Sequence, residues 1–253
     1  MIDTHTHLYS TELAHDIDAV IGRAISAGVD RFYLPAIDSE THGPMIALEE
    51  RYPGVCLSMI GLHPCSVKEN YLEEIAVIKE HLAQRKFAGI GETGLDFYWD
   101  TSFKAEQYKA LELQVTLALE HKLPLILHTR NAMQETIDFI TNYKGTGLKG
   151  IFHCFGGTVQ EAEQIIECGF LLGIGGVLTY KKAGLDLVLA ETGMEHIVLE
   201  TDAPYLSPVP YRGKRNESAY LVEVAKKLAE VKKISLEEVD RITTENAENL
   251  FGK

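Results

Sequence analysis

Short apolar runs, spaced along the whole chain and separated by longer stretches with helical periodicity, are the feature that most constrains the fold. The predicted strands are residues 2–5, 31–34, 55–61, 87–91, 124–128, 150–153, 170–174 and 197–200. The first of the intervening stretches repeats apolar residues at helical spacing, in the series Leu13, Ile17, Val20, Ile21 and Ala24. Strands and helices that alternate eight times in roughly 250 residues predict an α/β fold, a (β/α)8 TIM barrel.

A doubly wound parallel sheet is the alternative, but such a sheet carries a glycine-rich turn after an early strand. Here the first strand is followed by His5-Thr6-His7 instead. No linker or block of charge divides the 253 residues, so we expect one domain over residues 1–253. Further helices are predicted over residues 41–52, 72–85, 104–121, 133–143, 159–168 and 185–192, from near Val222, and from a capping box at Ser235–Glu238 to residues 251–252.

The chain is acidic, with 37 Asp and Glu against 24 Lys and Arg and a formal net charge of −13. A general polyanion binder uses clustered Lys and Arg to displace counterions from phosphates. This composition excludes that mode over the whole surface. If the substrate is anionic, local cations must offset the average charge, and bound metal ions are the obvious supply.

The cysteines, Cys56, Cys65, Cys154 and Cys168, are too sparse for a disulfide framework and include no CxxC pair. They fit a reducing, intracellular compartment. The first residues lack the basic and apolar regions of a signal peptide, and no apolar run approaches the ~18 residues of a membrane span. We expect no membrane association, and no obligate protein partner is evident.

Metal-binding side chains follow most of the predicted strands. They are His5 and His7, His63, Glu92, His128, His153, and Glu200 with Asp202. In a barrel, the carboxyl ends of the strands converge on one mouth, where active sites are built. Several imidazoles and carboxylates around one cavity predict a divalent-metal site with two ions, and this ligand set does not choose between Mg, Zn and Mn.

Four of these residues have roles that follow from their chemistry. His5 and His7 are two apart in a strand, so both point into the same space. Glu92 has two oxygens and can bridge two cations. Asp202 can bind a metal and accept a proton from water. Taken singly, Glu92 also fits a helix cap or an ion pair, and Asp202 fits a turn.

Two further residues near the mouth are less defined. Glu200 shares the face of Asp202 if the strand continues, as a weak ligand or as a partner of a ligand. His63 precedes a proline and either orients substrate by a hydrogen bond or serves packing. Cys154 adjoins His153 on the opposite strand face, so we expect it to pack outward.

Basic and aromatic residues in the mouth loops are candidates for substrate contact. Arg212 and Arg215 follow the eighth strand and Arg130 follows the fifth, and Arg binds phosphate through two hydrogen bonds. Tyr98 and Trp99 follow the fourth strand and suit stacking on an unpaired base. A solvated loop and a packed lid are the respective alternatives.

The motifs at these positions resemble those of the TatD-type deoxyribonucleases, in the superfamily of metal-dependent hydrolases. They lie at residues 3–7 (DTHTH), 61–64 (GLHP), 91–96 (GETGLD), 127–130 (LHTR), 152–157 (FHCFGG), 199–204 (LETDAP) and 244–252. The resemblance spans nearly the whole chain. It departs from the family pattern at Thr93, where a branched aliphatic residue is usual, and at Cys154, where Ser is usual.

The resemblance implies a cytoplasmic TIM-barrel nuclease that uses divalent metals to cleave DNA phosphodiester bonds, as a 3′-to-5′ exonuclease that prefers single strands. It assigns His5, His7 and Asp202 to the first metal, Glu92 to the bridge, and His128 with His153 to the second metal. Relatives with a carbamylated lysine have Lys where this chain has Glu92. The alternatives are a D-aminoacyl-tRNA deacylase, an amidohydrolase or a lactonase on the same scaffold, and a metal-free binding protein.

Overall fold

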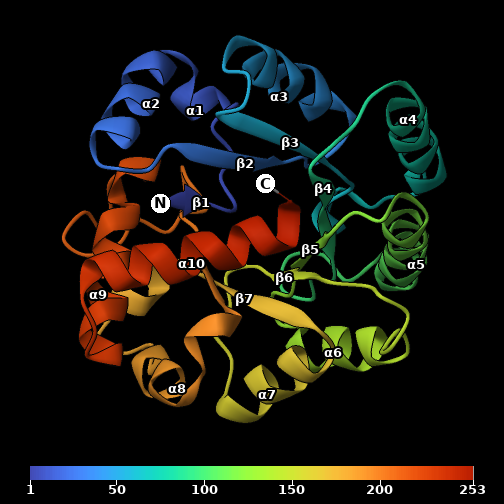
Figure 1. Ribbon diagram of the computed structural model, residues 1–253. Coiled ribbons are helices and arrows are strands. Elements are labelled where there is room, and N and C mark those ends of the chain that lie inside the picture. Colours follow the sequence, from blue (N-terminus) through green and yellow to red (C-terminus); the bar gives the residue numbers. More distant parts are fainter. Residues whose placement is uncertain (253) are drawn as a thin grey trace.

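Eight parallel strands form one sheet, in which each strand pairs with the next along the chain (Figure 1). The structure, a computed structural model, describes residues 1–252. The strands are β1 (Ile2–Asp3), β2 (Arg31–Pro35), β3 (Cys56–Ile60), β4 (Gly89–Gly94), β5 (Leu125–His128), β6 (Gly150–Phe152), β7 (Phe170–Ile174) and β8 (Ile197–Leu199). The predicted single-domain (β/α)8 barrel is confirmed, and all eight strands lie where the apolar runs placed them.

Helices surround this sheet on the outside, except the last, which lies across one end of the barrel, as Figure 1 shows. They are α1 (Thr11–Ala14), α2 (Ile17–Ser26), α3 (Ser39–Arg51), α4 (Tyr71–Gln84), α5 (Lys104–His121), α6 (Met133–Thr141), α7 (Val159–Glu167), α8 (Leu185–Glu191), α9 (Leu221–Lys232) and α10 (Leu236–Phe251). One prediction is wrong: the apolar series from Leu13 to Ala24 forms two helices. Asp16 is the N-cap of α2, and its carboxylate binds the distant Arg215.

Alternating residues of the strands build two apolar layers, because successive side chains in a strand face opposite sides. Phe32 and Leu34 of β2 pack outward against the helices, whereas Tyr33 faces the barrel interior. The inner layer is Ile2, Tyr33, Met59, Ile126, Ile151 and Val198, with Ala247 and Leu250 of α10. Full burial of each large apolar side chain contributes about 1.5–3 kcal/mol.

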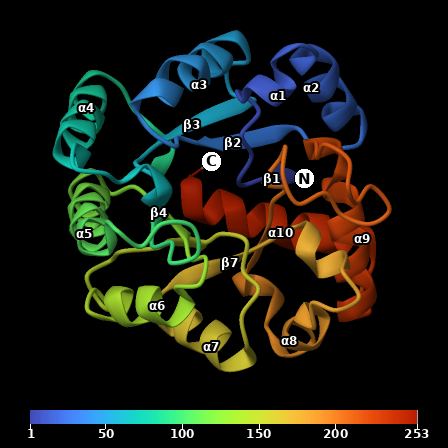
Figure 2. The same ribbon diagram turned by 180° about the vertical axis from the view of Figure 1, so that it is seen from behind.

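Helix α10 closes one opening of the barrel, which it crosses in Figure 1. The ring of Phe251 stacks on Tyr33 with 3.8 Å between centroids. Seen from behind, in Figure 2, the opposite opening is bordered by the loops that follow the strands. This opposite opening, the mouth, is where the strand-end residues gather.

Backbone hydrogen bonds beyond β1 and β8 close the barrel. The amide of Thr4 donates to the carbonyl of Leu199 at 3.0 Å, and the amide of Asp202 donates to the carbonyl of His5 at 2.9 Å. These bonds hold the segment that carries His5 next to the segment that carries Asp202.

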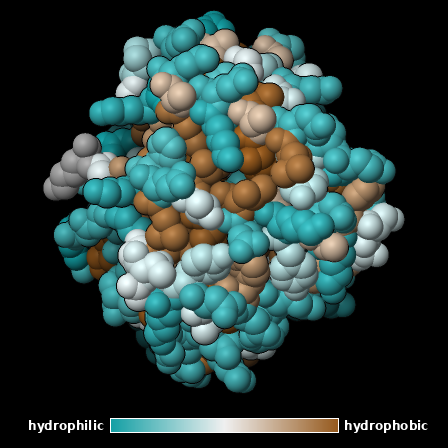
Figure 3. All heavy atoms as spheres, turned by 90° about the vertical axis from the view of Figure 1, so that its right-hand side faces the viewer, coloured by the Kyte–Doolittle hydropathy of each residue, from teal (hydrophilic) through white to brown (hydrophobic). Residues whose placement is uncertain are grey.

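The outer surface on the side of α4 and α5 is largely hydrophilic, with an apolar region towards its centre (Figure 3). Among residues 1–252, no helix has the length and apolar character to cross a membrane.

Candidate metal centre

Glu92 of β4 lies at the centre of the mouth and is 2% exposed. Its Oε2 atom is 3.1 Å from Nε2 of His5 and 3.5 Å from Nε2 of His7. Asp202 joins this side of the cluster, because its Oδ1 is 3.7 Å from Nε2 of His5 and 3.5 Å from Nε2 of His7. The two histidines that the strand period placed on one face therefore converge on two carboxylates.

The other oxygen of Glu92 faces a second group of histidines. Its Oε1 is 2.8 Å from Nδ1 of His128, 3.1 Å from Nε2 of His153 and 3.3 Å from Nε2 of His63. One buried carboxylate thus contacts five histidines from four different strand ends, divided between its two oxygens.

The local backbone of β4 explains how Glu92 reaches this position. The pairing of β4 with β5 shifts register between Ile90 and Thr93. Glu92 lies within this irregular part of the strand. At Gly91 the two strands approach so closely that a Cβ would lie 2.6 Å from the Cβ of Ile126. Glycine is required there because any larger residue would push β4 away from β5.

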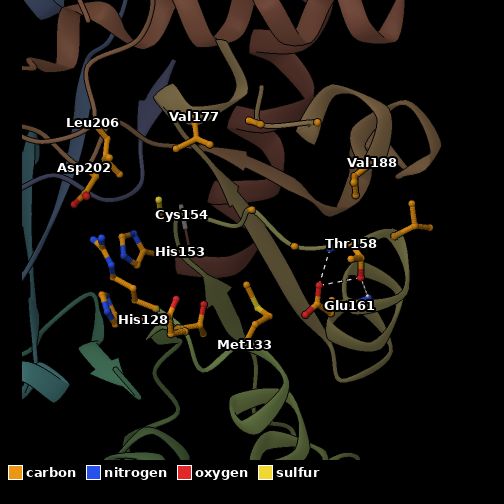
Figure 4. Close-up of a pocket in the computed structure, with 18 of the residues that line it drawn as sticks. His128, Met133, His153, Cys154, Thr158, Glu161, Val177, Val188, Asp202 and Leu206 are labelled. Carbon is orange, nitrogen blue, oxygen red and sulfur yellow. Dashed lines mark hydrogen bonds between the residues drawn. The ribbon is translucent and has the colours of Figure 1, made fainter. Parts of the chain in front are cut away.

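Two other residues at the mouth adopt the left-handed conformation, which non-glycine residues rarely take. They are Asp202, with φ of 55°, and Cys154, with φ of 49°. At Cys154 this turn ends the strand alternation, so the expectation that its side chain packs outward is wrong. The thiol instead lines a cavity beside His153 (Figure 4).

Outer hydrogen bonds fix the orientation of the histidines, as ligand histidines in proteins commonly require. The hydroxyl of Tyr9 donates to the carbonyl of Pro35 at 2.6 Å, so its oxygen accepts from Nδ1–H of His7 at 3.0 Å. This leaves the lone pair of His7 on Nε2, the atom that faces Glu92. Tyr9, which lies two residues beyond His7, was not predicted from the sequence.

Glu200 orients His153 in the same way. Its Oε1 accepts from the amide of Cys154 at 2.6 Å and lies 3.2 Å from Nδ1 of His153. The carboxylate fits because residue 173 is glycine, whose hypothetical Cβ would lie 2.2 Å from Oε2 of Glu200. Of the two roles left open for Glu200, the contacts favour a partner of a ligand.

Asp96 orients the ring of His128, because its Oδ2 lies 2.8 Å from Nε2 of that histidine. Asp96 belongs to the motif at residues 91–96, but no role was predicted for it from the sequence. Its signal was a carboxylate four residues after Glu92, in a mouth loop.

His63 is arranged as a donor. The amide of Cys65 donates to Nδ1 of His63 at 3.0 Å, and burial, with His128 nearby, keeps the pKa of His63 below its usual value. The neutral ring therefore carries its proton on Nε2, which faces Glu92. This tautomer suits a hydrogen bond better than metal binding, although His63 lies in a group with Glu92 and His128 that is compact enough for an ion.

The electrostatics of the cluster favour cation binding. Burial acts to raise the pKa of Glu92, but the surrounding imidazoles, first the charge of His153 and also the hydrogen bond with His128, outweigh it and hold the pKa well below the usual range. Burial, together with His153, lowers the pKa of His5. The buried carboxylate is therefore ionised and His5 is neutral, which are the forms that bind divalent metals.

The residues fit a metal by a second test. His5 is fully buried, and among the residues described neither of its ring nitrogens makes a hydrogen bond, because the 3.1 Å contact of Nε2 with Glu92 lacks hydrogen-bond geometry. A buried polar group without a partner is costly unless a ligand satisfies it. Three compact groups could hold an ion: His5, His7 and Glu92; His5, His153 and Asp202; and His63, Glu92 and His128. His153 thus lies near both sides of Glu92.

A cavity of about 880 Å³ opens from the cluster towards α7 and α8. In Figure 4, His128, His153 and Asp202 lie at one end, and Thr158 and Glu161 lie at the other. Most of the walls between them are apolar, formed by Met133, Val159, Val177, Leu187, Val188 and Leu206.

The predicted substrate contacts have different surroundings. Arg130 lines the cavity, and its Cζ lies 4.1 Å from the ring centroid of Tyr98 and 5.3 Å from that of Trp99. The aromatic residues are exposed, Tyr98 by 51% and Trp99 by 68%, so they form no packed lid. Arg212 lies over the ring of Tyr180 at 4.2 Å.

Arg215 requires a correction. Its guanidinium makes two hydrogen bonds to the carboxylate of Asp16, at 2.7 and 2.8 Å, and a third to the carbonyl of Glu12. These contacts anchor the loop after β8 to the start of α2. The geometry therefore does not favour Arg215 as a phosphate contact.

A parallel barrel with a buried histidine and carboxylate cluster at its mouth defines the class of metal-dependent hydrolases. The family model described as "TatD related DNase" matches residues 2–252, and the chain belongs to that family. It is therefore an enzyme, a metal-dependent hydrolase.

Individual relatives agree with this assignment. The chain is 37% identical to the uncharacterized metal-dependent hydrolase YabD of Bacillus subtilis, over 99% of this chain and 98% of that one. It is 32% identical to the 3′-5′ ssDNA/RNA exonuclease TatD of Pectobacterium parmentieri, over 99% of both. The crystal structure of YjjV, a TatD homologue from Escherichia coli, matches with a TM-score of 0.94 and 28% identity, over 100% of this chain and 98% of that one.

Proposed function

We propose that this protein hydrolyses phosphodiester bonds in DNA, as a 3′-to-5′ exonuclease that prefers single-stranded ends. The observation that carries the proposal is the position of Glu92, whose two oxygens face two groups of histidines at the end of a cavity bordered by Arg130. The similarity to a relative named as a single-strand exonuclease supports the substrate class.

Two divalent ions would be held on either side of Glu92. His5, His7 and Asp202 would hold the first, and His128 with His153 would hold the second. Divalent cations at such sites lower the pKa of water and offset the charge of a phosphate. The set of nitrogen and carboxylate ligands is compatible with Zn, Mn and Mg.

Asp202 is the candidate proton acceptor. Burial acts to raise its pKa, but the hydrogen bond with His7 and the charges of His153 and His7 lower it. The carboxylate therefore stays ionised at neutral pH and can accept a proton from the attacking water. Its side chain is 15% exposed, which leaves it open to the cavity.

Arg130, Tyr98 and Trp99 would hold the strand. The guanidinium can donate two hydrogen bonds to a phosphate. The exposed rings can stack on bases, at about 1–3 kcal/mol per base. A flexible single strand can bring a terminal phosphate down to Glu92, whereas a stiff, wide duplex cannot enter the mouth. A cytoplasmic location is a further prediction.

The test is the product ladder from single-stranded DNA labelled at its 5′ end. In Mg²⁺ we expect stepwise shortening from the 3′ end, and EDTA should abolish it. The Asp202→Asn variant is the control for a contaminating nuclease. No cleavage by metal-loaded wild-type protein, together with turnover of a lactone, an amide or a D-aminoacyl-tRNA, would refute the proposal.

A further inference from the structure

The carboxylate of Asp96 is shared between the metal centre and the loop that carries the exposed aromatic residues. Its Oδ2 is 2.8 Å from Nε2 of His128. Its Oδ1 accepts from the amide of Tyr98 at 2.9 Å and from the amide of Trp99 at 3.0 Å. Asp96 is only 1% exposed, so water does not compete for these bonds.

The backbone of Asp96 is held in place from outside the barrel. Gln107 of α5, itself 2% exposed, accepts from the amide of Asp96 at 2.9 Å and donates to its carbonyl at 3.1 Å. The two peptide groups that flank the Cα atom of Asp96 are thus fixed. The side chain of Asp96 has a defined position from which its two oxygens reach His128 and the loop.

This geometry has a consequence for His128. Because Oδ2 can only accept while Asp96 is ionised, Nε2 of His128 carries a proton. The other nitrogen, Nδ1, is the atom 2.8 Å from Oε1 of Glu92, and in the neutral ring that binds a cation it carries the lone pair. Asp96 therefore selects the tautomer of His128 that can bind a cation beside Glu92.

We propose that Asp96 is a positioning residue that couples metal binding at His128 to the conformation of the aromatic loop, residues 97–100. A change in the position of His128 moves Oδ2, and the rigid carboxylate transmits that movement to the amides of Tyr98 and Trp99. Coupling between two sites is reciprocal, so a DNA strand stacked on the loop changes metal affinity at His128 by the same factor as metal binding changes affinity for the DNA. The inference rests on the proposed metal centre, but it does not depend on the identity of the substrate.

The test uses Zn²⁺ alone, without nucleic acid, and two readouts. Affinity is measured by competition with a chromogenic chelator. The loop is followed by the fluorescence of Trp99, the only tryptophan in the chain. In the wild type we expect the fluorescence of Trp99 to change as Zn²⁺ fills the site that includes His128.

The Asp96→Asn variant keeps the size of the side chain but can no longer accept from both His128 and the loop. We expect a 10- to 100-fold weaker Zn²⁺ affinity at one site, the range for partners of ligand histidines, and loss of the fluorescence response. Asp100→Asn is the matched control, because Asp100 belongs to the same loop but contacts Ser102 and Lys68. It should behave as the wild type. Wild-type affinity and response in Asp96→Asn would overturn the coupling.

A second pair of variants changes the loop and leaves Asp96 intact. The coupling can therefore be tested even if Asp96→Asn does not fold. Tyr98→Pro removes an amide that donates to Oδ1 and should weaken Zn²⁺ binding, whereas Tyr98→Ala keeps the amide and should not. Equal affinities in this pair would also overturn the coupling. His128→Ala separates the two proposals, since unchanged Zn²⁺ binding in that variant would refute the metal centre itself.

Discussion

Replacement of Glu92 by Gln tests the shared carboxylate most sharply. The substitution keeps the shape of the side chain, removes one negative charge, and turns one oxygen into an amide donor. Since the two oxygens of Glu92 face different histidine groups, both groups lose part of their attraction for a cation, and one group loses its oxygen ligand outright.

The magnitude follows from burial and distance. Unit charges about 4 Å apart interact by about 4 kcal/mol at an effective dielectric constant of roughly 20. At about 1.4 kcal/mol for each factor of ten, this corresponds to a dissociation constant raised roughly a thousandfold at each side of Glu92. Screening by solvent reduces it little, because Glu92 is 2% exposed.

The assay is Zn²⁺ titration of chelator-treated protein, with metal content per chain measured by elemental analysis and folding followed by circular dichroism. Glu200→Gln is the comparison, because Glu200 contacts one histidine of the cluster, His153. It should lose about 10- to 100-fold in affinity at one site. If folded Glu92→Gln retained wild-type affinity for every ion and wild-type hydrolysis, the bridging role would be refuted.

Three further predictions concern the residues around the cluster. Trp99→Ala should lower the preference in kcat/KM for single-stranded over blunt duplex ends by roughly 5- to 150-fold, the equivalent of about 1–3 kcal/mol of stacking, and an unchanged preference would refute the stacking role. Arg215→Ala should lower the melting temperature and leave KM for oligonucleotides unchanged. Arg215 holds the pKa of Asp16 down at about 2. The stability from this pair is therefore present above the ordinary Asp pKa of about 3.9 and is lost as pH falls towards 2. The difference in melting temperature between the wild type and Arg215→Ala should disappear over that range. A raised KM in Arg215→Ala would instead support the phosphate role. His63→Ala should reduce kcat/KM at least roughly tenfold by loss of a hydrogen-bond donor while metal content stays constant, and loss of one metal per chain would make His63 a ligand instead.

Much of the fold was predictable because the physical signals were local. The eight strands follow from short apolar runs, and the barrel follows from their regular alternation with helices. The break between α1 and α2 was not predictable, because Asp16 owes its position to Arg215, 199 residues away. Because the sequence does not reveal this contact, Arg215 had the pattern of a free cation.

The convergence of the cluster was predictable for a related reason. Parallel strands bring their carboxyl ends together, so His5, His128 and His153 meet whatever the details of the loops. Cys154 was misplaced because its left-handed turn breaks the strand alternation. Tyr9 and Asp96 were missed because their roles depend on individual hydrogen bonds between segments, which no residue spacing encodes.

Anomalous diffraction from crystals of the protein grown with Mn²⁺ tests the shared role of Glu92 most directly. We expect two anomalous peaks, one beside Oε2 of Glu92 with His5 and His7, and one beside Oε1 with His128. A single peak, or peaks that do not contact Glu92, would contradict the account.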